Sequence, residues 1–118
     1  MAADTVDKEL LKGTIPLMVL SLIDKRDLYG YQIIKYLRVL SGETFVFKEG
    51  TLYPILHSLE KRQFIVSYWQ ESSVGRKRKY YRISEQGLRE LTDRLMAWNT
   101  FTGAVALVLE GEVPVNEA

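Results

Sequence analysis

The fold of this protein is decided by residues 49–84, "EGTLYPILHSLEKRQFIVSYWQESSVGRKRKYYRIS", where the spacing of the apolar side chains changes from helical to strand-like. The first part predicts an amphipathic helix, because four apolar residues follow the i, i+3, i+4, i+7 spacing of one helical face: Leu52, Ile55, Leu56 and Leu59. Proline is best tolerated in the first turn, so Pro54 favours a helix start near Thr51. A start at Glu49 with a local kink is the alternative.

The second part of the stretch predicts a β-hairpin. The runs "FIVSYWQE" (64–71) and "KYYRI" (79–83) are rich in β-branched and aromatic residues with a period of two. We expect one of the adjacent Tyr80 and Tyr81 in the core and the other on the surface of the hairpin. The connection contains a glycine and then four consecutive cations, which we expect at the tip of the hairpin: Arg76, Lys77, Arg78 and Lys79.

Basic charge is concentrated in this half of the chain. Residues 48–90 contain nine lysines and arginines against five glutamates, a net charge of +4, whereas the whole chain carries only +1. A local basic patch favours a polyanionic partner more than the near-neutral total suggests.

Two helices are predicted before residue 49. The first begins with Asp7 as a possible cap and ends near residues 24–26, with a bend at Pro16, which interrupts the helical hydrogen bonding. The second follows the polar break "DKRD" as "YGYQIIKYLRVL" (29–40) and stops at "SG" (41–42).

A last helix is predicted after the hairpin, with Ser84 as its N-cap. Its apolar residues follow the alternating 3,4 spacing of a heptad seam about three heptads long, which is typical of a helix that pairs with a second copy. The predicted dimer interface consists of Leu88, Leu91, Leu95, Trp98, Val105 and Leu109.

Together these elements predict a mainly α fold with a small β-hairpin, an α+β winged helix-turn-helix. Residues 7–83 form the DNA-binding domain, residues 84–110 the dimerisation helix, and residues 111–118 a frayed tail. The helix that begins near residue 49 is the reader of the major groove, and the hairpin is the wing that holds phosphates. The predicted DNA-binding residues are Lys48, Gly50, Thr51, Tyr53, His57, Arg76, Lys77, Arg78 and Lys79.

Composition argues against other classes of function. Cysteine is absent and His57 is the only histidine, so neither a thiolate nor a histidine metal site is expected. Neither a phosphate-binding glycine motif nor a nucleophile elbow is present, and we expect no enzyme and no cofactor. The longest apolar run, residues 15–23, is about half of what a membrane span needs. We therefore expect a soluble, cytoplasmic protein.

Four blocks resemble the PadR-like family of bacterial transcription regulators: "LLKGTIPLMVLSLI", "LYGYQI", "EGTLYPILHSLEKRQFI" and "GRKRKYYRISEQG". The resemblance spans residues 10–109 and implies a homodimeric repressor whose C-terminal helix dimerises. The single short C-terminal helix with a tryptophan is similar to the smaller, LmrR-like subgroup. In that subgroup the matching tryptophan lines a pore at the dimer centre where flat aromatic effectors stack. Thr102 departs from it, standing where the drug-sensing member has an acidic residue.

By this resemblance, the effector site would comprise Leu10, Thr14, Leu17, Leu95, Trp98 and Thr102. A tryptophan in a heptad seam also fills dimer cores, so a regulator without an effector is an alternative. A winged-helix module that contacts protein or RNA is another. The expected partners are double-stranded DNA with a pseudo-palindromic operator, a second copy of the chain, and a small aromatic effector.

Overall fold

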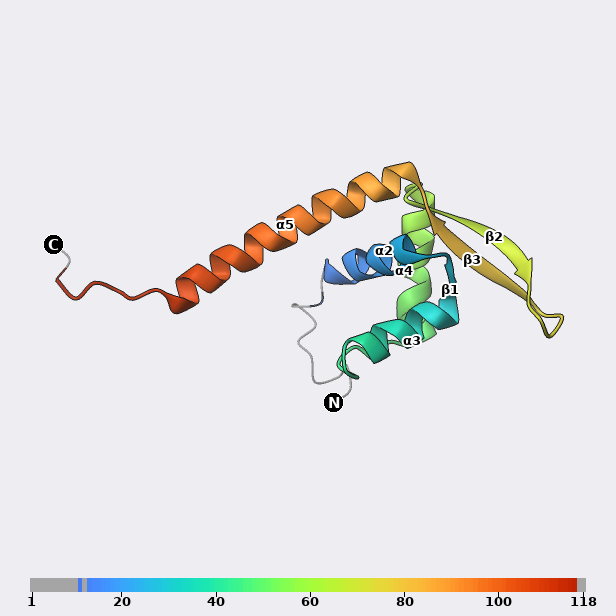
Figure 1. Ribbon diagram of the computed structural model, residues 1–118, viewed down its shortest axis with the longest axis horizontal. Helices are drawn as coiled ribbons and strands as arrows, with labels where there is room; N and C mark the ends of the chain where they lie inside the picture. The colour runs from blue at the N-terminus through green and yellow to red at the C-terminus, as the bar shows by residue number, and fades with distance from the viewer. Residues whose placement is uncertain (1–10, 12, 117–118) are drawn as a thin grey trace.

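The structure, a computed structural model, describes residue 11 and residues 13–116. Within these residues the elements follow one another as α2 (Thr14–Lys25), β1 (Leu28–Tyr29), α3 (Gly30–Leu40), α4 (Glu49–Lys61), β2 (Ile65–Glu71), β3 (Lys77–Ile83) and α5 (Glu85–Glu110). Three helices pack against one end of a small sheet, and the hairpin extends from them as a wing (Figure 1). The predicted winged-helix fold is confirmed. The predicted cap Asp7, Leu10 and the last two residues of the tail lie outside the described residues.

The N-terminal region differs from the single bent helix expected through Pro16. Helix α2 begins at Thr14, after Gly13, whose φ of 86° lies in the left-handed region that favours glycine. Pro16 therefore occupies the third position of α2, where a backbone N–H has no partner within the helix. Pro16 therefore removes no helical hydrogen bond, because α2 begins two residues before it and leaves it in the first turn.

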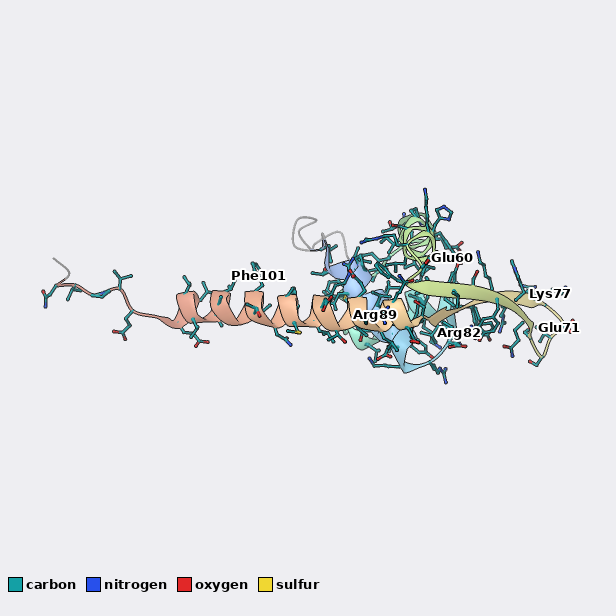
Figure 2. The ribbon with its side chains drawn as sticks, turned by 90° about the horizontal axis from the view of Figure 1, so that it is seen from above. Glu60, Glu71, Lys77, Arg82, Arg89 and Phe101 are labelled. Carbon is teal, nitrogen blue, oxygen red and sulfur yellow. The ribbon has the colours of Figure 1, made fainter. Side chains whose placement is uncertain are left out.

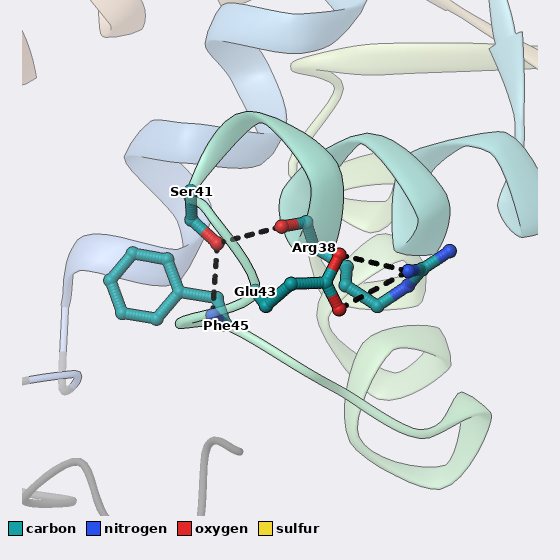
Figure 3. A network of polar contacts seen from close by, with 4 residues as sticks. All are labelled: Arg38, Ser41, Glu43 and Phe45. Atoms are coloured by element: carbon teal, nitrogen blue, oxygen red, sulfur yellow. Dashed lines mark hydrogen bonds and ion pairs between the residues drawn. The ribbon is translucent and has the colours of Figure 1, made fainter. Parts of the chain in front are cut away.

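A polar network ends α3 and shapes the loop to α4 (Figure 3). The Ser41 hydroxyl donates to the Arg38 carbonyl oxygen at 3.1 Å and accepts from the Phe45 amide at 2.9 Å. Glu43, which has a φ of 67°, accepts from the Arg38 guanidinium at 3.0 and 3.2 Å. This network confirms the predicted stop at residues 41–42 and directs the chain toward α4.

Helix α4 takes the earlier of the two predicted starts. It begins at Glu49 and contains Pro54 as its sixth residue. The first turn closes through the Lys48 carbonyl oxygen, which accepts from the amides of Thr51 and Leu52 at 3.0 and 3.1 Å. The buried face packs into the core through Leu52, Leu56 and Leu59.

The sheet has three antiparallel strands in the order β1-β3-β2. Strand β1 was not predicted: its two residues, Leu28 and Tyr29, pair with Tyr81 and Tyr80 in the middle of β3. Strands β2 and β3 pair from Ile65 with Ile83 to the hairpin end. The short strand β1 fixes the base of the hairpin to the turn between α2 and α3.

Helix α5 has two halves with different surroundings. Its first turn is capped as predicted, since the Ser84 hydroxyl accepts from the Gly87 amide at 3.0 Å. Leu91, one turn further on, is only 5% exposed and belongs to the core of its own chain. Beyond Trp98 the helix extends away from the winged domain, in the direction opposite to the wing (Figure 1). Its distal half therefore presents apolar residues to solvent, including Phe101, Val105, Val108 and Leu109.

Candidate nucleic-acid interface

The outer face of α4 gathers the predicted reader residues. Lys48 caps the helix, and Gly50, Thr51, Tyr53 and His57 follow within its first two and a half turns. All five are exposed, while the leucines of the same helix are buried. Exposed polar residues at the N-terminal end of such a helix are those that can reach base edges and phosphates in a major groove.

The ring of Tyr53 lies against Gly30, the first residue of α3. A Cβ at Gly30 would overlap the Tyr53 hydroxyl oxygen and would lie 2.8 Å from Cζ of the ring. Only glycine therefore allows the ring to lie over the first turn of α3. Burial raises the pKa of Tyr53, and the nearby charge of Glu49 raises it further. The phenol stays protonated and able to donate a hydrogen bond at neutral pH.

The basic residues of the wing are arranged differently from the prediction. Only Arg76 lies in the loop between the strands, because β3 already begins at Lys77. Side chains alternate across a strand, so Lys77 and Lys79 share one face and Arg78 points to the other. The expectation of four cations together at the tip is therefore wrong; the strand divides them between two faces.

The face with Lys77 and Lys79 is continuous with α4. Ser67, on the same face, donates a hydrogen bond from its hydroxyl to Oε2 of Glu60 at 2.5 Å, and Lys79 Nζ lies 3.7 Å from Oε1 of that carboxylate. Glu60 is in the last turn of α4, so one carboxylate joins reader and wing. Figure 2 shows Lys77 and Glu60 on one side of the sheet and Arg82 on the other.

The opposite face of the sheet carries an aromatic cluster that the sequence did not predict. The Tyr80 ring stacks on Tyr68, with centroids 5.7 Å apart, and meets the Tyr29 ring edge-on at 5.3 Å. The Arg78 guanidinium lies 4.6 Å from the centre of the Tyr29 ring. Arg78, which is partly exposed, therefore lies over Tyr29 on this face and not on the face with Lys77. The prediction for the adjacent tyrosines is confirmed, because Tyr81 is 4% exposed in the core and Tyr80 lies on this outer face.

A hydrogen bond from the Tyr68 hydroxyl to Oδ2 of Asp27, 2.5 Å long, ties the hairpin to the turn before α3. This bond is the largest cause of a raised pKa for Tyr68, with burial second. The two residues are 41 positions apart, and nothing in their local sequence indicates the pairing.

The predicted effector residues are brought together in part. A groove of about 390 Å³ runs between α2, the end of α3 and α5 and includes Leu17, Leu95 and Trp98. Thr14 and Thr102 do not line it and donate their hydroxyls to backbone carbonyl oxygens of Leu11 and Trp98. The groove also contains residues that the sequence did not suggest: Met18, Ser21, Leu22, Lys25, Tyr36, Leu37, Leu40, Ser41 and Phe45.

The predicted dimer residues fall into two groups. Leu91 is buried within its own chain, whereas Leu88, Leu95, Trp98 and Val105 are partly exposed and Leu109 is 78% exposed. Among these six residues, this chain buries only Leu91, and the exposed fraction is largest at the distal end of the helix, at Leu109.

The described part of the chain shows neither a metal-binding cluster nor a membrane-spanning helix. Residue 11 and residues 13–116 contain no group of three or more histidine, aspartate or glutamate side chains placed to hold a metal ion. In the same part of the chain, no helix is long and apolar enough to cross a membrane.

Known proteins similar to this chain include transcriptional regulators. Residues 19–93 match the transcriptional regulator PadR-like family. A protein from Lysinibacillus sphaericus is 34% identical over 106 residues, which cover 90% of this chain and 97% of that protein. A PadR-like transcriptional regulator from Bacillus cereus is 32% identical, with a TM-score of 0.79 over 88% of this chain and 99% of that one. A transcriptional regulator from Clostridium thermocellum is 33% identical, with a TM-score of 0.76 over 83% and 95%.

The matched residues run from α2 through the reader helix and the wing into α5, and the similar structures share the arrangement of these elements. The chain therefore belongs to the PadR-like family of transcriptional regulators, DNA-binding winged-helix proteins and not enzymes.

Proposed function

We propose that this protein is a homodimeric repressor that places α4 of each copy in the major groove of a pseudo-palindromic operator. The observation that carries the proposal is the continuity of the exposed face of α4 with the Lys77 side of the wing, joined at Glu60. In this proposal Lys48, Gly50, Thr51, Tyr53 and His57 approach bases and phosphates, and Arg76 and Lys77 hold the backbone.

The test is selection of duplexes by the purified protein from a random-sequence pool, at low and at physiological salt. The expected result is an inverted repeat whose half-sites lie about one helical turn, roughly 10 base pairs, apart. Binding to a reporter promoter carrying that site should lower transcription. Absence of any enriched duplex even at low salt would favour the alternative of a protein- or RNA-binding module.

The proposed division of the wing cations gives a mutational prediction. Arg76→Ala combined with Lys77→Ala should weaken binding to every duplex and make the log–log dependence of affinity on salt shallower by about 1 to 2, because each lost phosphate contact removes about 0.9 from that slope. Arg78→Ala is the matched control and should leave the slope unchanged, since Arg78 lies over Tyr29 on the other face. Anisotropy titrations at several salt concentrations measure both. Equal effects of the two variants would refute the division.

The proposed dimer is supported by the distal half of α5. Phe101, Val105 and Val108 are exposed on a helix that continues beyond its own domain (Figure 1). A long apolar helix face of this kind favours association. Pairing with the same helix of a second copy covers the seam of both chains at once, as a two-fold interface requires.

The groove beside Trp98 favours an effector as a second part of the proposal. Most of its lining residues are apolar side chains of α2, α3 and α5, with Lys25 and two serines among them, and the indole offers a flat surface for ring stacking. A compound seated there would change operator affinity only by binding one dimer geometry more tightly than the other. Leu10, Thr14 and Thr102 remain proposed contacts from the resemblance alone.

The effector proposal is tested in the Trp69→Phe variant, in which Trp98 is the only tryptophan. Titration with a panel of planar aromatic compounds should quench its fluorescence, and the compounds that quench should lower operator affinity. If no member of a varied panel does so, the seam is fully packed and the regulator works without such an effector.

A further inference from the structure

Trp69 is an exposed tryptophan on the wing. It lies in β2, and 66% of it is exposed to solvent. Among the described residues, the aromatic pairs and the cation–ring contacts involve tyrosines and phenylalanines but not Trp69. The chain's other tryptophan, Trp98, already lines the groove beside α5. A single exposed ring is common on a protein surface, so a partner is indicated only by the strand face that Trp69 shares and by the charges beside it.

The register of the hairpin determines which side Trp69 occupies. Trp69 is two residues after Ser67, so both side chains lie on the same face of β2. Ser67 is the residue that donates to Glu60 of α4, so this face is the one continuous with the reader helix. Trp69 lies about 7 Å further along the strand, at roughly 3.3 Å per residue, between α4 and the wing tip.

Positive charge surrounds the indole on that face. Trp69 pairs directly with Lys79, and Lys77 is its diagonal neighbour two residues along β3. Beyond them Arg76 occupies the exposed loop. Two glutamates lie on the same face: Glu60 accepts from Ser67 and lies 3.7 Å from Lys79 Nζ, and Glu71 lies opposite Lys77 in the strand register at the end of the hairpin.

We infer that Trp69 is a DNA-contacting residue of the wing that packs against the deoxyribose–phosphate backbone beside the reader's major groove. The chemistry fits one occupant. The ring face buries the apolar edge of a deoxyribose, the indole N–H donates to a phosphate oxygen, and the neighbouring Lys77 neutralises an adjacent phosphate. This inference rests on the proposed function. It adds to the DNA interface an uncharged contact, which the distribution of charge along the chain does not reveal.

The contact is expected to add affinity without sequence preference. Deoxyribose and phosphate are the same at every base pair, so losing Trp69 should weaken binding to selected and random duplexes by a similar factor. It should leave the salt slope nearly unchanged, because an uncharged side chain releases no counterions. This combination distinguishes Trp69 from Lys77 beside it, because loss of that lysine changes the slope.

The experiment uses the full chain labelled with 5-fluorotryptophan, which gives two fluorine resonances because the sequence has two tryptophans. The resonance lost in Trp69→Phe identifies Trp69. Adding the duplex selected by the wild-type protein should shift that resonance and reduce its response to exchange of H₂O for D₂O.

A second experiment measures affinity. Trp69→Ala should bind both selected and random duplexes about tenfold more weakly than the wild type. Val66→Ala, an exposed residue on the other face of β2, is the matched control and should bind as the wild type does.

The outcomes separate the inference from the proposed function. If the wild type binds duplex DNA while the Trp69 resonance stays unchanged, the inference is overturned and the regulator stands. Full affinity of Trp69→Ala overturns it equally. A Trp69 resonance that moves with protein concentration in the absence of DNA would assign the surface to a second copy instead. If the wild type binds no duplex, the proposed function itself has failed.

Discussion

Val105→Asp combined with Leu109→Asp should convert the protein to a monomer and lower operator affinity by a factor of 100 or more. Both residues lie in the half of α5 beyond the winged domain, 39% and 78% exposed in the single chain. The aspartates are therefore solvated in an isolated chain, whereas a paired seam would bury them without partners. Loss of the dimer removes the second half-site contact, and with it the avidity of roughly 10²–10⁴ that linked binding supplies.

Sedimentation velocity and anisotropy titration with the selected operator measure the two effects. Leu107→Asp is the matched control, because Leu107 is 75% exposed on the opposite side of the same helix turn. It should remain dimeric. A double variant that stays dimeric would place the interface elsewhere. Leu91→Asp cannot serve this purpose, because Leu91 is buried in its own chain and its substitution would damage the fold.

Gly87→Ala should destabilise the folded protein by about 3 kcal/mol and lower its Tm on the order of 10 °C. Gly87 lies in the first turn of α5, where a Cβ would overlap the Phe64 carbonyl oxygen and lie 2.7 Å from Cγ1 of Ile83. That carbonyl oxygen cannot move freely, because it accepts from the Ser84 amide at 3.0 Å. The added methyl group therefore forces the start of α5 away from the turn between α4 and β2.

Thermal unfolding followed by circular dichroism at fixed protein concentration measures this effect, since association itself shifts Tm. Gly103→Ala provides the control in the same helix. A Cβ at Gly103 meets no atom within 4 Å, and alanine is the better helix former, so this variant should be unchanged or slightly more stable. A Gly87→Ala protein as stable as the wild type would show that the close approach is not required.

The elements with strong periodicity were predictable from the sequence. The leucines of α4, the cap at Ser84 and the stop at residues 41–42 all depend on neighbours within one or two turns, and all are confirmed. The start of α2 was not predicted from the sequence. The apolar pattern continues through Gly13, but the left-handed backbone of this residue precedes the first turn of α2. The two-residue strand β1 carries no pattern of its own and exists because β3 pairs with it.

The residues of the candidate interface were predictable from the sequence, but the side of the sheet on which each wing side chain lies was not. The number of cations near the wing follows from the sequence, yet the residue at which β3 begins decides which of them face α4. A start at Lys77 separates Arg78 from Lys77 and Lys79, and no local signal sets that start. The same register places Trp69 beside the lysines and pairs Tyr68 with Asp27, 41 residues away.

The fold class, the reader helix, the basic wing and the seam of the last helix follow from the sequence alone, because each depends on residue types repeated at short, regular spacing. Three features become visible only in the folded chain: which wing side chains share the reader's side, which seam residue belongs to the core, and which residues line the groove at Trp98. These follow from strand register and helix packing between residues far apart in the chain, where a shift of one residue sends every side chain to the other face.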